Sequence, residues 1–97
     1  MNKHKTEINI DSINKSRIYW ACRRGMRELD LLIIPFFKYN FDSLKKRDKQ
    51  LFSHLLERDD PDLFSWLMNH EEPVDANFKR IISIIQDSNQ QRDAETL

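Results

Sequence analysis

The sequence predicts an all-α protein, a compact bundle of about five short helices. One glycine and three prolines in 97 residues leave little of the turn chemistry that β-hairpins need. Apolar residues recur three and four positions apart along most of the chain, as on one face of a helix. Helices this short are marginal alone in water, so packing must stabilise them. The length fits one domain, which we assign to residues 11–87 between a flexible N-terminal segment (1–10) and a flexible polar tail (88–97).

The first predicted helix begins at Asp11 or Ser12, because either side chain can cap a helix, and it runs to about residue 23. Its apolar face carries Ile18, Ala21 and Cys22. The chain's single glycine, Gly25, then fits the left-handed conformation found just past a helix end.

The second predicted helix has a clear amphipathic stripe. Pro35 falls inside it, where proline removes a backbone donor and clashes with the preceding turn. We therefore expect a kink or an early end near Pro35, with residues 39–43 as a connection. The stripe consists of Leu29, Leu32, Ile33 and Phe36.

Three further helices follow. The third spans about residues 45–57, with Leu51, Phe52, Leu55 and Leu56 facing inward. Acidic residues before Pro61 mark the start of the fourth, at about 61–69, since acidic caps and an early proline are typical of helix N-termini. Asp75 can cap the fifth helix. The inward stripe of the fifth helix consists of Phe78, Ile81, Ile82 and Ile85.

Charge and cysteine content narrow the class of protein. The net charge is zero, which gives no support to nucleic-acid binding. Residues 1–30 carry seven Lys and Arg against four acids, whereas residues 57–75 carry seven acids against one Arg. This asymmetry fits either ordinary solvated helix ends or a dipolar surface that steers a protein partner. The chain has one cysteine, no apolar run near the roughly 18–20 residues that cross a bilayer, and no apolar signal core. These observations predict a cytoplasmic protein that is not integral to a membrane.

No residue pattern predicts catalysis or a bound cofactor. The histidines His4, His54 and His70 lack metal-site spacing. The only cysteine, Cys22, lies on an apolar face and behaves as a core residue. A phosphate cradle needs several glycines, and the acids of residues 57–62 are explained by helix capping. From these residues we expect no catalytic residue, no metal site and no stably bound cofactor.

Two tryptophans lie off the apolar stripes. Trp20 and Trp66 fall one or two positions away from the inward faces of their helices. Exposed tryptophan is a frequent anchor of protein interfaces, but half-buried packing explains these positions equally well. Both interpretations remain open from the sequence.

The segment around Gly25 is the strongest candidate for a working surface. Glycine lets a partner approach the backbone closely. Arg24 and Arg27 offer planar donors for carboxylates or carbonyls, and Glu28 falls in the first turn of the second helix, where it can accept hydrogen bonds from Arg24 or from a partner. A plain helix cap with an incidental salt bridge is an equally good interpretation of the residue types alone.

The string Arg17-Ile-Tyr-Trp-Ala-Cys-Arg-Arg-Gly-Met-Arg-Glu-Leu-Asp30 resembles the RGxxE region of FAD assembly factors of the SdhE type, also described as succinate dehydrogenase assembly factor 2 in mitochondria. Residues 35–37, 41–44, 55–57, 59–70 and 84–86 also resemble bacterial members, so the similarity covers about residues 14–86. A local departure is the basic run 45–48, where bacterial relatives often carry an acidic helix start.

The resemblance implies a non-enzymatic helper. Such factors bind the flavoprotein subunit of succinate dehydrogenase, in bacteria also that of fumarate reductase, and promote covalent attachment of FAD to a histidine of that subunit. FAD would then belong to the partner. By carry-over, Arg24, Gly25 and Glu28 form the functional surface. Its expected neighbours are Arg17, Trp20, Arg23, Met26, Arg27 and Asp30.

Other functions remain open at this point. Related sequences have been named antitoxins, which would bind a small membrane toxin. A small enzyme or direct flavin carrier is disfavoured by the lack of a phosphate cradle. A DNA-binding helical module is disfavoured by zero net charge, although the basic first segment keeps it in view.

Overall fold

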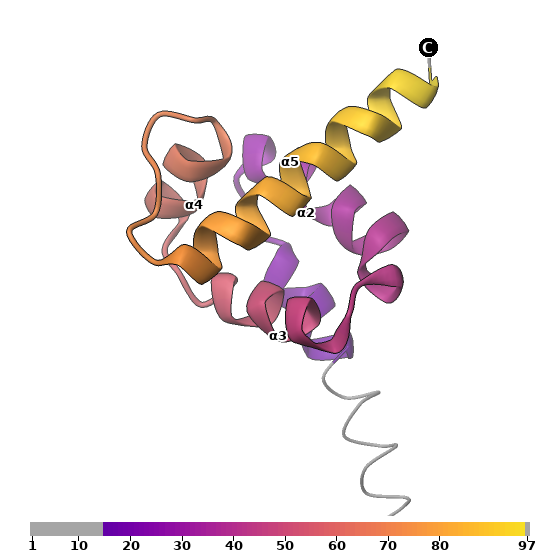
Figure 1. The fold of residues 1–97 in the computed structure, drawn as a ribbon, viewed down its shortest axis with the longest axis horizontal. Coiled ribbons are helices and arrows are strands. Elements are labelled where there is room, and N and C mark those ends of the chain that lie inside the picture. The colour runs from indigo at the N-terminus through magenta and orange to yellow at the C-terminus, as the bar shows by residue number, and fades with distance from the viewer. Residues whose placement is uncertain (1–14, 97) are drawn as a thin grey trace, which may run out of the picture.

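The computed structural model describes residues 15–96, and within that range every regular element is helical (Figure 1). The N-terminal helix covers residues 15–22 of the described chain. It is followed by α2 (Arg27–Asn40), the 3-10 turn η1 (Phe41–Ser43), α3 (Lys46–Leu55), α4 (Asp60–Leu67) and α5 (Ala76–Thr96). The predicted all-α class is confirmed, with five helices. The predicted segment 1–10 and the predicted caps Asp11 and Ser12 lie outside the described residues.

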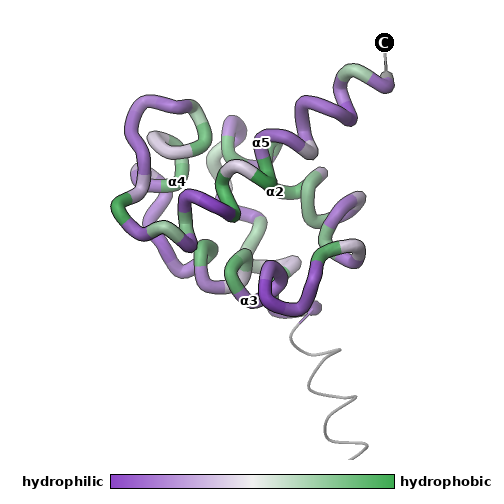
Figure 2. The backbone as a smooth tube through the Cα atoms, in the orientation of Figure 1, coloured by the Kyte–Doolittle hydropathy of each residue, from purple (hydrophilic) through white to green (hydrophobic). Residues whose placement is uncertain are grey.

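Helix α5 holds the bundle together. It packs against α2, α3 and α4, and α2 also packs against α4. In Figure 1, α5 runs diagonally across the other helices, in orange to yellow. Figure 2 shows that the hydrophobic stretches lie mostly where the helices meet, whereas most of the last turns of α5 are hydrophilic.

A single apolar core joins all the helices. Four phenylalanines form its aromatic part, with ring centroids 4.9 Å apart for Phe37 and Phe41 and 5.3 Å apart for Phe36 and Phe52. Burying one such side chain stabilises the fold by about 1.5–3 kcal/mol. The buried apolar residues are Cys22, Leu29, Ile33, Phe36, Phe37, Phe41, Phe52, Leu55, Leu56, Leu63, Leu67, Ile81, Ile82 and Ile85.

Helix α2 passes through Pro35 and continues to Asn40, so of the two predicted alternatives, a kink or an early end, the early end is wrong. The carbonyl deprived of its donor belongs to Leu31, whose side chain is 61% exposed, and water can replace the lost hydrogen bond. Phe36 and Phe37 directly after the proline are buried. Their burial offsets the roughly 3 kcal/mol that proline costs in a helix interior. Residues 39 and 40 of the predicted connection 39–43 therefore belong to α2, and η1 follows directly at Phe41.

Helix α4 ends in a Schellman motif that stops it two residues before the predicted end at Asn69. Asn69 adopts a φ of 62°, the left-handed conformation that asparagine tolerates. Its N–H bonds the Trp66 carbonyl at 3.2 Å, and the His70 N–H bonds the Ser65 carbonyl at 2.8 Å. At the other end, Asp59 precedes the helix as predicted, but its side chain makes no capping hydrogen bond.

Helix α5 begins as predicted and ends later. The Asp75 carboxylate accepts the Asn77 N–H at 2.7 Å, which confirms the predicted cap. The helix then continues to Thr96, beyond the predicted domain end at residue 87. Polar side chains hold the extension against α2: the Asn89 amide donates to the Leu32 carbonyl at 2.9 Å, and Arg92 donates to Asn40 Oδ1 at 2.5 Å.

Candidate partner-binding surface

Gly25 lies in the link between the N-terminal helix and α2. Its φ is +80°, so the predicted left-handed conformation is confirmed. A Cβ placed on Gly25 would meet no atom within 4 Å. The fold therefore needs glycine here for the backbone angle and not for a close approach inside the molecule. The same open space leaves the backbone of Gly25 accessible to another protein.

The guanidinium of Arg24 is directed into the molecule and holds this link in place. Nε donates to Asp60 Oδ1 at 2.8 Å, and Nη2 donates to the Arg58 carbonyl at 2.8 Å. Nη1 donates to the carbonyls of Ala21 and Leu56 at 2.9 and 2.7 Å. The side chain is only 15% exposed. Arg24 thus joins the link to the α3–α4 connection, and its ion-pair partner is Asp60 rather than Glu28.

Two further candidate residues also act inside the chain. The Asp30 carboxylate accepts the backbone N–H of Arg24 at 2.8 Å, which fixes the link relative to the first turn of α2. Met26 immediately precedes α2, and its carbonyl accepts the Asp30 N–H at 2.9 Å while its side chain packs against the core. The structure therefore gives Arg24, Met26 and Asp30 a positioning role.

The N-terminal helix presents an exposed aromatic and basic group beside the link. Trp20 is 63% exposed and contacts Tyr19 edge-on, with ring centroids 5.7 Å apart. The guanidinium of Arg23 lies over the Trp20 ring at 5.3 Å from its centroid, a cation–π arrangement. Arg17 is exposed on the same helix. Tryptophan and arginine are the residues most enriched in interface hot spots.

The start of α2 continues this exposed surface. Arg27 and Glu28 are exposed, and neither forms an ion pair with any described residue. Leu31, one turn further on the same face, is 61% exposed. Leu31 was not among the surface residues predicted from the sequence, although its position outside the apolar stripe indicated that it would be exposed. We call Trp20, Arg23, Gly25, Arg27, Glu28 and Leu31 the glycine-link surface.

The second tryptophan has a different environment. Trp66 is half-buried between α4 and α5, with its ring centroid 5.7 Å from that of Phe78. It packs against the core, so of the two tryptophans only Trp20 is available as a surface anchor.

Cys22 is a core residue, as predicted. Its side chain is fully buried. Burial raises the pKa of the thiol to about 12, although the nearby charge of Arg24 acts in the opposite direction. The thiol therefore stays protonated at neutral pH and is a poor nucleophile.

The acidic residues around the start of α4 form ion pairs with neighbouring arginines. Asp60 binds Arg24, and Asp62 binds Arg58 at 3.2 Å. Among residues 15–96, no three histidine, cysteine or acidic side chains gather in a way that would hold a metal ion. None of the described helices is long and apolar enough to span a membrane.

The fold and the surface define a class: a small helical protein with an exposed aromatic and charged surface, held in place by polar contacts inside the chain. Comparison with known proteins gives the family. Residues 16–89 match the Sdh5 family, described as "flavinator of succinate dehydrogenase". The chain belongs to this family of assembly factors.

Individual relatives are similar over most of their length. The chain is 62% identical over 79 residues to the FAD assembly factor SdhE of Pectobacterium atrosepticum, covering 81% of this chain and 90% of the relative. It is 60% identical to the protein of the same name from Yersinia pseudotuberculosis, with the same coverage. A solution structure of a UPF0350 protein superposes with a TM-score of 0.69 at 44% identity, covering 84% of this chain and 86% of that one.

Proposed function

We propose that this protein binds the flavoprotein subunit of succinate dehydrogenase through the glycine-link surface and promotes covalent attachment of FAD to that subunit. The observation that carries the proposal is the division of roles within Arg24-Gly25-Met26-Arg27-Glu28. Arg24 anchors the link internally through four side-chain hydrogen bonds. Gly25, Arg27 and Glu28 are left exposed around it.

This arrangement suits recognition of a folded protein. A rigid link costs little conformational entropy on binding, because its backbone is already fixed. Arg27 and Glu28 offer opposite charges to a partner, and Trp20 and Leu31 offer apolar area next to them. A compact interface centred on an aromatic anchor is the usual form of a specific contact.

The proposed mechanism assigns the chemistry to the partner. The flavoprotein holds FAD and supplies the histidine that becomes linked to it. This protein binds the incompletely assembled subunit and favours the arrangement in which histidine and flavin are correctly oriented. Orientation alone can accelerate a reaction between bound groups by several orders of magnitude. The flavoprotein of fumarate reductase is a second partner in this proposal, and the cytoplasm is the proposed location.

The test is covalent flavin incorporation into the purified flavoprotein subunit, with FAD present and with or without this protein. In-gel flavin fluorescence after denaturation reports only covalently bound flavin. We expect a faster rise in fluorescence when the protein is present, for the succinate dehydrogenase subunit and in a parallel reaction for the fumarate reductase subunit. An unchanged rate with the succinate dehydrogenase subunit would contradict the proposal.

A pull-down from cells separates this function from its main alternative. Capture of a flavoprotein subunit agrees with the proposal. Capture of a small membrane protein without any flavoprotein would favour the toxin-regulating function instead.

A further inference from the structure

A groove of about 1090 Å³ lies between the N-terminal helix and the η1–α3 segment, next to the glycine-link surface. One wall comes from the N-terminal helix, through Arg17 and Ala21. The opposite wall comes from α3, through Lys46 and Lys49. The proposed function as described above does not involve this groove.

The rim of the groove is mainly basic. Lys15, Arg17, Lys46 and Lys49 line it, against only two acids. One of those acids, Asp42, is paired with Lys15 at 2.9 Å. Arg17 and Lys46 form no ion pair with any residue in the described part of the chain.

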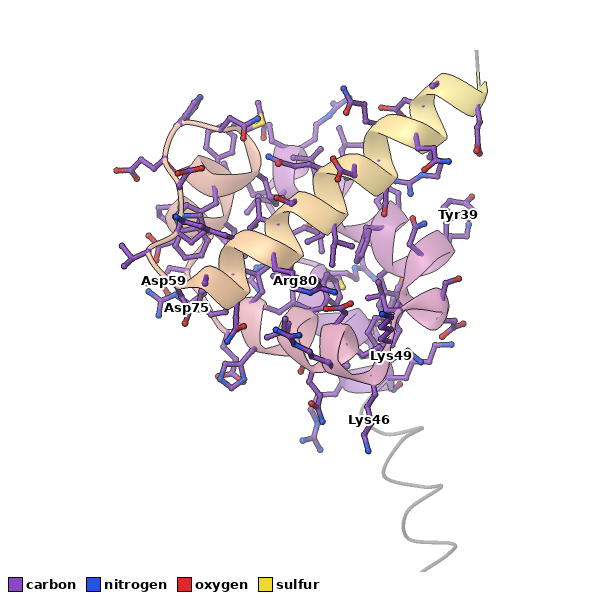
Figure 3. All side chains as sticks on the ribbon, in the orientation of Figure 1. Tyr39, Lys46, Lys49, Asp59, Asp75 and Arg80 are labelled. Carbon is purple, nitrogen blue, oxygen red and sulfur yellow. The ribbon has the colours of Figure 1, made fainter. Side chains whose placement is uncertain are left out.

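The two α3 lysines that line the groove, Lys46 and Lys49, lie at the edge of the molecule that α3 forms. Figure 3 shows Lys46 and Lys49 at the lower edge of the view, near α3, whereas Asp59 and Asp75 lie at its left edge. Lys46 is in the first turn of α3, where a positive charge is unfavourable to the helix dipole. Lys46 and Lys49 lie one turn apart on α3 and form no ion pair with a described residue, so together they create a positive potential that a negatively charged ligand would relieve.

The floor of the groove is apolar. Phe41 and Leu56 contribute to it and are each only 5% exposed, and Ile18 and Ala21 lie partly buried beside them. Lys49 extends over the Phe41 ring, with Nζ 5.5 Å from its centroid. A basic rim above an apolar floor fits a peptide that carries carboxylates and at least one apolar side chain. Phosphate backbones would use the charges but not the floor, and the zero net charge of the chain gives them no general attraction.

We propose that this groove binds an acidic segment of the flavoprotein subunit, with apolar side chains of that segment resting on Ile18 and Ala21 above the buried Phe41 and Leu56. The inference rests on the proposed function, because it concerns the same partner. The position of the groove supports this proposal, because Arg17 and Ala21 lie on the helix that also carries Trp20. One partner can therefore occupy the groove and the glycine-link surface together.

The experiment compares two charge reversals in the same helix region. Lys46→Glu with Lys49→Glu reverses two charges that line the groove. Lys45→Glu with Arg47→Glu reverses two exposed charges next to them that do not line it, so the change in net charge is equal. Each protein, labelled with a fluorophore, is titrated with the purified flavoprotein subunit at low and at high salt.

We expect the groove pair to bind at least about tenfold more weakly than the wild type and to lose most of the salt dependence, while the control pair stays within about threefold. Equal weakening by both pairs would indicate long-range attraction only and would overturn the proposal, as would no weakening by the groove pair. If the wild type itself does not bind, the proposed function fails, which is a separate result.

Two further measurements keep the test decisive. Urea unfolding followed by circular dichroism checks that each variant folds. If Lys49→Glu unfolds the protein by removing its contact with Phe41, Lys46→Glu with Gln50→Glu tests the same groove without touching Lys49. Light scattering of the wild type alone tests the other occupant, because a dimer that the groove pair abolishes would assign the groove to a second copy and overturn the proposal.

Discussion

Arg24 connects three parts of the chain through one side chain. Its guanidinium donates to the end of the N-terminal helix at Ala21, to the end of α3 at Leu56, and to Arg58 and Asp60 before and within α4. Three of these acceptors are backbone carbonyls at helix ends or in links, which have no partner within a helix. Arginine alone offers enough donors in a planar arrangement to satisfy all of them.

We predict that Arg24→Ala lowers the free energy of unfolding by about 2–3 kcal/mol, because buried acceptors lose a charged donor. Arg24→Lys keeps the charge but makes fewer hydrogen bonds, so its free energy of unfolding should lie between those of the wild type and Arg24→Ala. Urea unfolding followed by circular dichroism measures both. Arg23→Ala is the matched control, since Arg23 is exposed and only covers Trp20, and it costs less than about 1 kcal/mol.

An Arg24→Ala protein as stable as the wild type would contradict the positioning role. If it were also unable to promote flavin attachment, Arg24 would have to contact the partner directly.

At the scale of elements, α3 and α5 are joined by an ion pair between buried Asp48 and the partly exposed Arg80. Asp48 accepts two hydrogen bonds from Arg80, from Nε at 2.8 Å and from Nη2 at 3.0 Å. The Asp48 side chain is only 6% exposed. The hydrogen bond from Arg80 and then its charge hold the pKa of Asp48 below its ordinary value, although burial acts in the opposite direction.

This pKa shift predicts an acid-dependent loss of stability. Because the folded-state pKa of Asp48 lies below the unfolded value of about 3.9, the pair contributes stability above that pH. The contribution is lost as the pH falls through the folded-state pKa. We expect Asp48→Asn to be less stable than the wild type at pH 7, and the difference to shrink as the pH falls below about 4.

Urea midpoints measured from neutral to acid pH test this. Asp42→Asn is the control, because its ion pair with Lys15 is exposed and contributes little. A difference between Asp48→Asn and the wild type that stays constant down to acid pH would contradict the assignment.

The C-terminal part of α5 is held by polar rather than apolar contacts. Asn89 and Arg92 bond the carbonyl of Leu32 and the side chain of Asn40 on α2. Arg92 also bonds Asn89 Oδ1 and lies over the Tyr39 ring. These contacts explain why a polar sequence remains helical here.

We predict that residues 88–92 are as ordered as the core turns of α5. Heteronuclear NOE values for their amides should match those of residues 81–85. Asn89→Ala should lower the free energy of unfolding by about 1 kcal/mol, and Gln90→Ala, at an exposed position, should change it little. Values near zero from residue 88 onward would restore the flexible tail that the sequence suggested.

These elements show what local sequence patterns determine. The apolar stripes predicted the helices because a 3.6-residue period is a local property, and Asp75 was identified as a cap for the same reason. Of the two outcomes expected at Pro35, the early end was wrong, and α5 continues past residue 87, because distant contacts decide where both helices end. The internal role of Arg24 was missed because its acceptors Leu56, Arg58 and Asp60 lie more than thirty residues away.

At the scale of the whole molecule, the structure consists of a stable bundle and an exposed surface that the bundle holds in place. The core and the Asp48–Arg80 pair fix the bundle, and Arg24 fixes the glycine link to it. The link then presents an exposed surface with Trp20 and Arg23 on one side and Arg27, Glu28 and Leu31 on the other. The central claim is that this surface contacts the flavoprotein and that flavin attachment depends on the contact.

The most direct test of this claim compares Gly25→Ala with Gly25→Arg in the flavin incorporation assay. Both variants place an L-residue at a φ of +80°, so both carry the same backbone strain of about 1–2 kcal/mol. Neither Cβ meets another atom within 4 Å, so the two should unfold at similar urea concentrations. Only arginine fills the space in front of the link. We predict that Gly25→Ala promotes covalent flavin attachment at close to the wild-type rate and that Gly25→Arg is slower by about tenfold or more. Equal rates for the two variants would contradict the account.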